Sequence, residues 1–248
     1  MAAMTRRDIH RWVRKTNRYL GLILGIQFFL WTAGGLYFSW TNIDTIRGDN
    51  LKQQIPSLSL DSAVANLSQI KQEVKSKLKA ESIESVQLVT VLGTTYYQLG
   101  YKTAGEMKSV LADAQTGQLR SALSEKEAIE CAKGRLKDTA TIKKVEYLTE
   151  AGPHHEYREK PLPAYAITFS GNVNTTVYVA AETGVVQTFR NDQWRIFDFL
   201  WMLHTMDYNG RDNINNWPLR VFSLLGLVAI VSGFVLFFVS RKKSKIKI

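Results

Sequence analysis

The chain has 248 residues, of which 45% are hydrophobic and 22% are charged, and its formal net charge is +10. Two short basic tails, residues 1–19 and 241–248, carry this whole charge, so the segment between them is neutral. This distribution excludes a nucleic-acid-binding protein, which would gather basic residues on a folded face. Cys131 is the only cysteine, which excludes an intramolecular disulfide, a C-x-x-C redox pair and a C-x-x-C-H haem attachment. We expect it to be a small buried apolar residue rather than a nucleophile.

Two uncharged apolar stretches predict membrane-spanning helices. The first runs from Leu20 to Trp40 and the second from Val221 to Val239. A hydrocarbon core of roughly 30 Å needs about 20 helical residues, so both stretches are long enough to cross it. A cleaved signal peptide is the alternative for the first stretch, but its apolar region exceeds the usual 7 to 15 residues or so.

The basic tails predict the topology of the chain. Both flank the predicted spans, and by the positive-inside rule both are cytoplasmic, where they contact anionic lipid of the bilayer. Residues from about Thr41 to Pro218 then face outward as one neutral segment. The sequence therefore predicts a domain held outside the membrane by one helix near each end.

The outer segment begins with a helical pattern followed by strands. The helical pattern starts at Ser59 and reaches about Leu78. Alternating apolar residues then predict strands at 86–92 and 95–101, and a third at 109–112 before Thr116-Gly117.

A second copy of the same order follows. Ser124 and Glu127 form a capping-box pattern that begins a helix to about Leu136, because each side chain satisfies a backbone donor at the other residue. Predicted strands lie at 142–148, 164–169, 176–180 and, beyond Thr183-Gly184, 185–189. The offset is 65 positions between Ser59 and Ser124 and 67 between the two Thr-Gly pairs, which indicates a duplicated unit. We predict an α+β outer domain of two helix-plus-antiparallel-sheet repeats flanked by two transmembrane α-helices.

These residues resemble a known family. The segments Asp113–Gly117 and Ala181–Gly184, each closing a helix-then-strands unit, look like the PepSY domain occurring twice, and the flanks look like PepSY-associated transmembrane helices. The resemblance implies a bacterial inner-membrane protein with a periplasmic domain. The predicted organisation is a cytoplasmic tail at 1–19, a transmembrane helix at 20–40, a linker and first repeat at 41–122, a second repeat at 123–190, an amphipathic interfacial helix and turn at 191–217, a second transmembrane helix at 218–240 and a cytoplasmic tail at 241–248.

His204 is the strongest candidate for a cofactor ligand. It belongs to an aromatic stripe at three- and four-residue steps, with Trp194, Phe197, Trp201 and Tyr208, whereas Asp198 is expected on another face of the helix. A neutral imidazole nitrogen can bind haem iron, and Trp201 and Phe197 could wall a b-type haem. One chain offers a single histidine here, so ligation by two histidines requires a homodimer. The alternative is an interfacial histidine bonded to backbone or water.

The resemblance also bears on this site. Some PepSY-associated membrane proteins are haem-containing ferric reductases with a histidine before the last helix, which His204 matches. The family often has another histidine before the first span, where this sequence has Asn17, a poor iron ligand. His10 lies across the membrane from His204, so a continuous haem relay is not expected.

His154-His155-Glu156 is the other polar cluster, in a loop bounded by Gly152-Pro153 and Pro161-Leu162-Pro163. Adjacent histidines in an extended loop do not form the zinc-protease motif. We expect a solvated loop, with weak metal binding by His154 and His155 as the alternative.

Three functions follow from the sequence. The first is an outer-face binding or regulatory module that grips a partner protein or peptide. The second is a homodimeric haem protein that assists ferric iron reduction or electron transfer. The third is an accessory subunit of a larger membrane complex. No catalytic constellation is recognisable, so enzymatic activity is expected only in the haem hypothesis.

Overall fold

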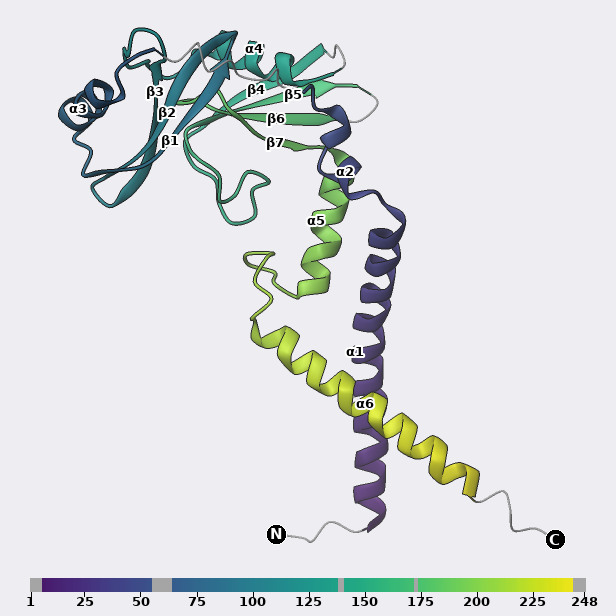
Figure 1. Cartoon of the computed structure of the whole chain (residues 1–248). Coiled ribbons are helices and arrows are strands. Elements are labelled where there is room, and N and C mark those ends of the chain that lie inside the picture. The colour runs from purple at the N-terminus through teal and green to yellow at the C-terminus, as the bar shows by residue number, and fades with distance from the viewer. Residues whose placement is uncertain (1–5, 55–63, 138–140, 172–173, 243–248) are drawn as a thin grey trace. The chain divides into compact units, whose positions relative to one another are not determined.

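The computed structural model describes residues 6–54, 64–137, 141–171 and 174–242, without the side chains of 6–17, 232 and 235–242. The chain divides into two compact units. The helical unit comprises residues 1–42 and 196–248, and the α+β unit comprises residues 43–195. The fold class predicted from the sequence is confirmed for the α+β unit, which has two antiparallel sheets with helices (Figure 1).

The helical unit is built from α1 (Arg6–Trp40), most of α5 (Asp192–Thr205) and α6 (Trp217–Lys242). In α1, residues Arg18–Trp40 are long and apolar enough to cross a membrane, which indicates that the chain is membrane-associated. In α6, the apolar part that the structure describes with its side chains is shorter, Trp217–Val231. The first predicted span is therefore present as an apolar helix of sufficient length, and the second stays a prediction.

Within the helical unit, α1 contacts both of the other helices. The side chains of Gln27 and Trp31 donate to the main-chain oxygen of Leu203, at 3.0 and 3.3 Å. That carbonyl lies in the last turn of α5, where the helix itself offers no partner. On α6, Gly226 lies against the ring of Phe28, since a Cβ there would meet the ring at 2.7 Å. Gln27 is thus buried in an apolar span because it caps a neighbouring helix.

The first part of the α+β unit is a three-stranded sheet with one helix. After the short α2 (Ile43–Ile46) and the 3₁₀ turn η1 (Asp49–Leu51) come α3 (Leu67–Leu78), β1 (Ser82–Val91), β2 (Thr94–Thr103) and β3 (Glu106–Asp113). The strands pair antiparallel in the order β1-β2-β3. Ile70 and Val74 of α3 are buried against Leu99, Tyr101 and Val110, which fixes the helix on one face of this sheet.

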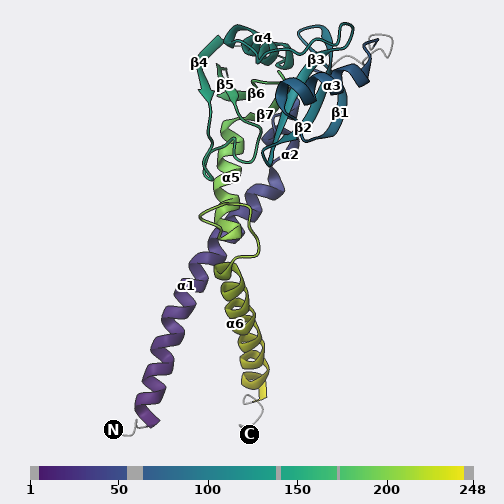
Figure 2. The same cartoon turned by 90° about the vertical axis from the view of Figure 1, so that its left-hand side faces the viewer.

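The second part is a four-stranded sheet with its own helix. It consists of α4 (Glu125–Arg135), β4 (Thr141–Leu148), β5 (Ala164–Ser170), β6 (Thr175–Ala180) and β7 (Val186–Arg190). The order is β4-β5-β6-β7, with every neighbouring pair antiparallel. Figures 1 and 2 both show α4 against this sheet. The predicted capping box is confirmed, with Ser124 and Glu127 satisfying each other's backbone donors.

A single core joins the two sheets. Its buried members include Ala128, Cys131 and Ala132 of α4 together with Ile167, Val177 and Val179 of the four-stranded sheet. Val91 of β1 and Leu111 of β3 belong to the same cluster. The three-stranded sheet thus has α3 on one face and the shared core on the other, so the two parts fold as one unit.

The two Thr-Gly pairs occupy equivalent turns. Gly117 has φ +77° and donates its N–H to the Asp113 carbonyl, and Gly184 has φ +66° and donates to the Ala180 carbonyl, both at 2.8 Å. The same backbone turn therefore follows β3 in the first part and joins β6 to β7 in the second, 67 positions apart.

The start of the first helix differs from the prediction. Residues 59–63 lie outside the described residues, and α3 begins only at Leu67, where the Asn66 side chain accepts a hydrogen bond from the Ser68 N–H at 2.9 Å. Val64 and Ala65 instead donate their N–H groups to the Ala114 carbonyl. This non-local pairing keeps residues 64 and 65 out of the helix, so the described helix begins only after the Asn66 cap.

Gly184 gives a test of the shared core. A Cβ there would lie 2.7 Å from Val91 Cγ1 and 3.0 Å from Leu123 Cδ2, at a positive φ. We expect Gly184→Ala to lower the free energy of unfolding by about 2–4 kcal/mol, because strain and overpacking add. Urea unfolding of the full chain in detergent, followed by circular dichroism, measures this loss.

Two other glycines provide matched controls. Gly93→Ala places a Cβ at φ +81° in open space, so it should cost about 1 kcal/mol, and Gly152→Ala meets no atom within 4 Å and should be neutral. A Gly184→Ala protein as stable as the Gly152→Ala protein would contradict the close packing.

Candidate functional site

A cleft of 440 Å³ lies between the two parts of the α+β unit. Its walls are residues 88–93 of β1 and the following turn, residues 130, 131, 134 and 135 of α4, and residues 184–186 of the turn into β7, with Gln54 also in the lining. Leu88, Val89 and Val186 are half-buried apolar residues of its lining. This combination of a concave surface and apolar walls is typical of binding sites.

Each wall owes its position to a local feature of the sequence. The small residues Ala128, Cys131 and Ala132 let α4 lie close to the sheet. At the opposite wall, Leu92 and Gly93 both have positive φ, 51° and 81°, as a two-residue turn between β1 and β2 requires. The helix and the hairpin therefore face each other across the cleft.

Leu92 is unusual for such a turn. A leucine at positive φ is strained, and its side chain is 41% exposed at the edge of the cleft. Backbone strain of this kind costs about 1–3 kcal/mol and gathers at ligand sites. Leu92 thus joins Leu88 and Val186 as an apolar group at this cleft.

Arg120 links the sheets beside the cleft. Its guanidinium binds Glu127 at 2.5 Å and donates to the Tyr96 hydroxyl at 3.2 Å. Hydrogen bonds from the Ser124 backbone and side chain, with the charge of Arg120, lower the pKa of Glu127. The carboxylate that caps α4 thereby also ties that helix to β2 of the other sheet.

Cys131 is buried, as predicted from the sequence, and lines the cleft. Burial raises the pKa of its thiol to about 11, so the thiolate is scarce at neutral pH. The residue is therefore a poor nucleophile.

The loop before β5 contains an ion-pair cluster that sequence reasoning missed. The Glu156 carboxylate accepts from Arg195 Nε and Nη2, at 2.9 and 3.0 Å, and from the Tyr178 hydroxyl at 2.7 Å. Burial, followed by the bond to Glu156, raises the pKa of Tyr178. Arg190 donates to the Glu156 carbonyl at 2.9 Å and lies 3.9 Å over the Trp194 ring. These contacts fasten the loop to β6, β7 and the first turn of α5.

The expectation of a solvated loop is correct for His154, which is exposed, and wrong for its neighbours. Tyr157 is fully buried and stacks on Tyr178 with ring centroids 4.7 Å apart. His155 accepts a hydrogen bond from the Tyr157 N–H through Nδ1, at 3.1 Å, which gives it a structural role. Among the described residues, no three His, Cys, Asp or Glu side chains gather to hold a metal ion. The weak metal site at His154 and His155 stays a prediction.

The aromatic stripe around His204 packs on α1. The His204 ring centroid lies 5.7 Å from that of Trp31, 6.1 Å from Trp201 and 6.2 Å from Phe38, and Phe197 lies 4.7 Å from Phe38. Among the side chains of this unit that the structure describes, His204 is the one imidazole, and it is exposed beside these rings. These side chains fit one half of a bis-histidine haem site and not a whole one. The prediction of haem at His204, walled by Trp201 and Phe197, stays untested.

A buried ion pair accompanies this stripe. Asp198, expected to face away from the aromatic side, is 3% exposed and pairs with Arg211 in the segment after α5. Asp207 accepts from the N–H groups of Gly210 and Asn213, at 3.0 and 2.9 Å, and backbone bonds of this kind lower the pKa of its carboxyl. Because a carboxylate buried alone is costly, Asp198 and Arg211 hold the end of α5 and the following turn together.

The fold and the cleft thus define a class: an α+β domain of sheets with covering helices in a chain with an apolar membrane-type helix. Comparison with known families identifies the domain. Residues 122–189 match the PepSY family, described as "Peptidase propeptide and YPEB domain". The chain therefore contains a PepSY domain, formed by α4 and β4–β7. The resemblance seen in the sequence is confirmed for this second repeat, while the first repeat and the membrane helices lie outside the match.

Other comparisons add little. No curated protein matches the chain. A crystal structure described as that of a lipoprotein from Clostridium difficile 630 matches with a TM-score of 0.23 and 13% identity, covering 50% of this chain and 91% of that one.

The reactivity of Cys131 tests the burial of this wall of the cleft. At pH 8, we expect iodoacetamide to alkylate the native protein more than about 100-fold more slowly than the urea-unfolded chain, whose thiol has a pKa of about 8.5. Mass spectrometry of quenched samples gives both rates, and Cys131→Ser shows any background. A native rate close to the unfolded one would place the thiol in solvent.

The haem prediction has a direct test. A chain expressed with haem available and purified in detergent should show a stoichiometric Soret band with sharp reduced α and β bands, lost in a folded His204→Ala variant. His154→Ala is the control and should keep the spectrum. A colourless, folded wild-type protein would reject haem binding.

Proposed function

We propose that this chain is a membrane-anchored binding module that holds its α+β unit outside the cytoplasm, where the unit grips a partner polypeptide. The observation that carries the proposal is the apolar cleft, because it is walled by the PepSY helix α4 and by the β1–β2 hairpin of the neighbouring sheet. A PepSY domain suggests a regulatory or binding role, and the cleft supplies a place for one.

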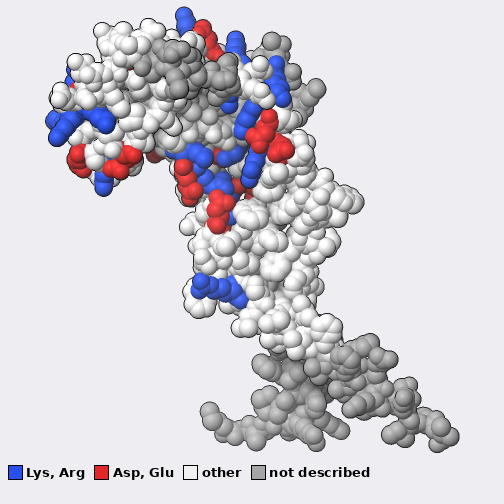
Figure 3. Space-filling model, viewed as in Figure 1, with Lys and Arg blue, Asp and Glu red and all other residues white. Residues whose placement is uncertain are grey.

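The charge distribution supports the proposed orientation. Figure 3 shows charged side chains gathered over the α+β unit and few on the described surface of the helices. Exposed apolar residues cover the helical unit, among them Leu22, Phe29 and Leu36 on α1 and Leu224 and Leu227 on α6. Such a surface favours lipid over water. The first residues of α1 and the last of α6 lie at the same end of this unit, which fits two cytoplasmic tails (Figures 1 and 2).

The ion pairs of the two units have structural roles, which supports binding rather than catalysis. Glu156, Arg195, Asp198 and Arg211 all have partners within their own units, where they fasten loops to helices or strands. Cys131 lacks the lowered pKa of a reactive thiol. The cleft therefore offers apolar contact together with the charged groups of Glu130 and Arg135 in its lining, as a protein or peptide partner requires.

Site-directed photo-crosslinking in intact cells tests the proposal. A benzophenone amino acid at Leu88, inside the cleft, should give a discrete polypeptide adduct on irradiation. The same probe at Met107, which is 62% exposed on β3 and does not line the cleft, should give none. Adducts of equal yield at both positions, or at neither, would contradict a partner held in the cleft.

A labelling control checks the orientation in the same cells. In a Cys131→Ser background, a membrane-impermeant maleimide should label Ser121→Cys, which is exposed in the α+β unit, without lysis. It should label Ser244→Cys in the basic tail only after lysis. The reverse pattern would place the α+β unit in the cytoplasm.

A further inference from the structure

We propose that the partner is an extended peptide with an acidic end, which binds by adding a strand to the free edge of β1; this inference rests on the proposed function and specifies its partner.

The first support is the free edge itself. β1 is the outer strand of its sheet and, among the described residues, pairs only with β2. A second cavity, of 340 Å³, follows residues 80–86 beside α3, and the cleft follows residues 88–93 beside α4 and the turn into β7, so a hollow borders each half of the strand. Along a strand, successive side chains point to opposite faces, so a cavity over one face would be lined by every second residue. Consecutive residues line both hollows, which indicates that the hollows border the edge of the strand.

The second support is the length of undisturbed pairing. A bulge interrupts the β1–β2 register between Ile83 and Ser85, after which the pairs run unbroken from Ser85 to Val91. Bulges protect edge strands from unwanted pairing, so this one limits strand addition to the part after it. Seven residues at about 3.3 Å each offer a platform of roughly 23 Å, which is typical of peptides bound by strand addition.

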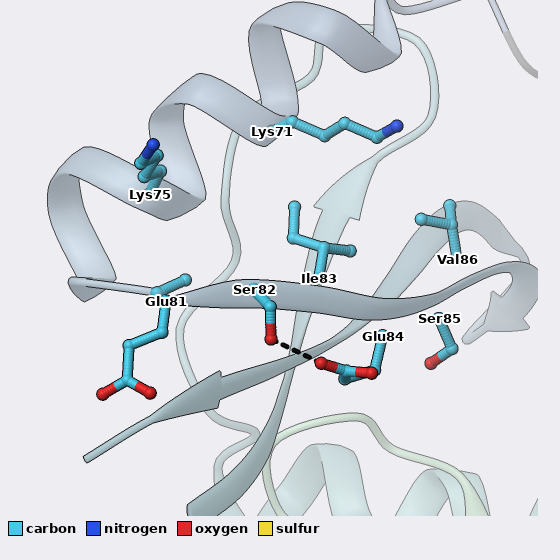
Figure 4. Close-up of a pocket in the computed structure, with 9 residues that line it drawn as sticks. Lys71, Lys75, Glu81, Ser82, Ile83, Glu84, Ser85 and Val86 are labelled. Atoms are coloured by element: carbon cyan, nitrogen blue, oxygen red, sulfur yellow. Dashed lines mark hydrogen bonds between the residues drawn. The ribbon is translucent and has the colours of Figure 1, made fainter. Parts of the chain in front are cut away.

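The third support is the chemistry of the two ends. At the Val91 end, the turn into β7 closes the cleft. Its lining contains the apolar Leu88, Val89 and Val186 and, on α4, the oppositely charged Glu130 and Arg135. At the other end, Lys71 and Lys75 of α3 extend above the strand (Figure 4). Both lysines are exposed, and among the described residues neither forms an ion pair.

Figure 4 also shows that the two sides of β1 carry different side chains, apolar ones toward α3 and acidic ones on the opposite side. Ile83 and Val86 point toward α3, whereas Glu81 and Glu84 point to the opposite side of the strand, where Glu84 accepts from the Ser82 hydroxyl. The side beneath the helix is therefore apolar with two positive charges above it. Lysines at positions i and i+4 repel each other slightly, and an anionic group between them removes that repulsion. An acidic residue or a C-terminal carboxylate at one end of the peptide fits this position.

The test uses a defined probe. A ten-residue peptide of alternating valine and threonine, ending in two aspartates, is added at millimolar concentration to the full chain in detergent. Hydrogen–deuterium exchange read by mass spectrometry should show slower exchange in residues 85–91, with β4, an outer strand of the other sheet, unchanged. Protection of β4 alone, or of no strand, would overturn strand addition to β1.

Charge variants test the binding of the peptide's acidic end separately from the pairing of its strand. Lys71→Glu combined with Lys75→Glu should weaken binding of the aspartate peptide roughly fivefold to tenfold. The matched control, Lys126→Glu combined with Lys143→Glu, makes the same charge change at exposed positions away from both hollows and should not alter it. Equal weakening in both variants would show a general charge effect and overturn the acidic end.

The outcomes distinguish this inference from the proposed function. A photo-adduct at Leu88 without protection of residues 85–91 would retain the binding module and reject strand addition. If neither the photo-adduct at Leu88 nor the protection of residues 85–91 is observed, both the binding module and strand addition are rejected. A dimer in light scattering of the peptide-free chain, with residues 85–91 already protected, would make a second copy of the chain the occupant and overturn the peptide.

Discussion

The α+β unit depends on the packing of α4, because this one helix serves two sheets. Its buried residues are Ala128, Cys131 and Ala132, and all three have small side chains. On one side they contact the four-stranded sheet, and the same core takes in Val91 and Leu111 from the three-stranded sheet. A larger residue at these positions would separate the layers, since packed interiors tolerate little added volume. The cleft exists because the sheets meet at this helix and leave the space beyond it open.

Local sequence signals predicted much of this unit. The strands appear within a few residues of their expected bounds, since each carries alternating or continuous apolar residues between turn residues. The capping box at Ser124 and Glu127 was predictable because both partners lie within four positions. The two Thr-Gly turns were found as a repeated pair, and positive φ at Gly117 and Gly184 explains why glycine stands there.

What the sequence could not predict depends on residues far apart in the chain. Glu156 and Arg195 are 39 positions apart, and nothing local marks either as the partner of the other. Asp198 looked like a polar position on an amphipathic helix, yet it is buried because Arg211 reaches it from the next segment. Gln27 lies 176 positions from Leu203, whose carbonyl it satisfies. The cleft has the same origin, because its walls come from three separate segments. Sequence periodicity could identify the two sheets, but not the space left where they meet.

The two sheets treat their free edges differently, and this difference bears on binding. The outer strand β4 carries Lys143, Lys144 and Glu146 as exposed charges, and such residues discourage another strand from pairing. β1 has charge only at its beginning, at Glu84 beside the bulge, and its remaining residues from Ser85 to Val91 are uncharged. An uncharged edge is a liability in a protein that does not use it, because it pairs with any exposed strand. Apolar cleft residues and the strained Leu92 lie beside this part of the edge. The exposed apolar surface and the backbone strain both lower the stability of the free protein, and a partner that covers them would offset that loss.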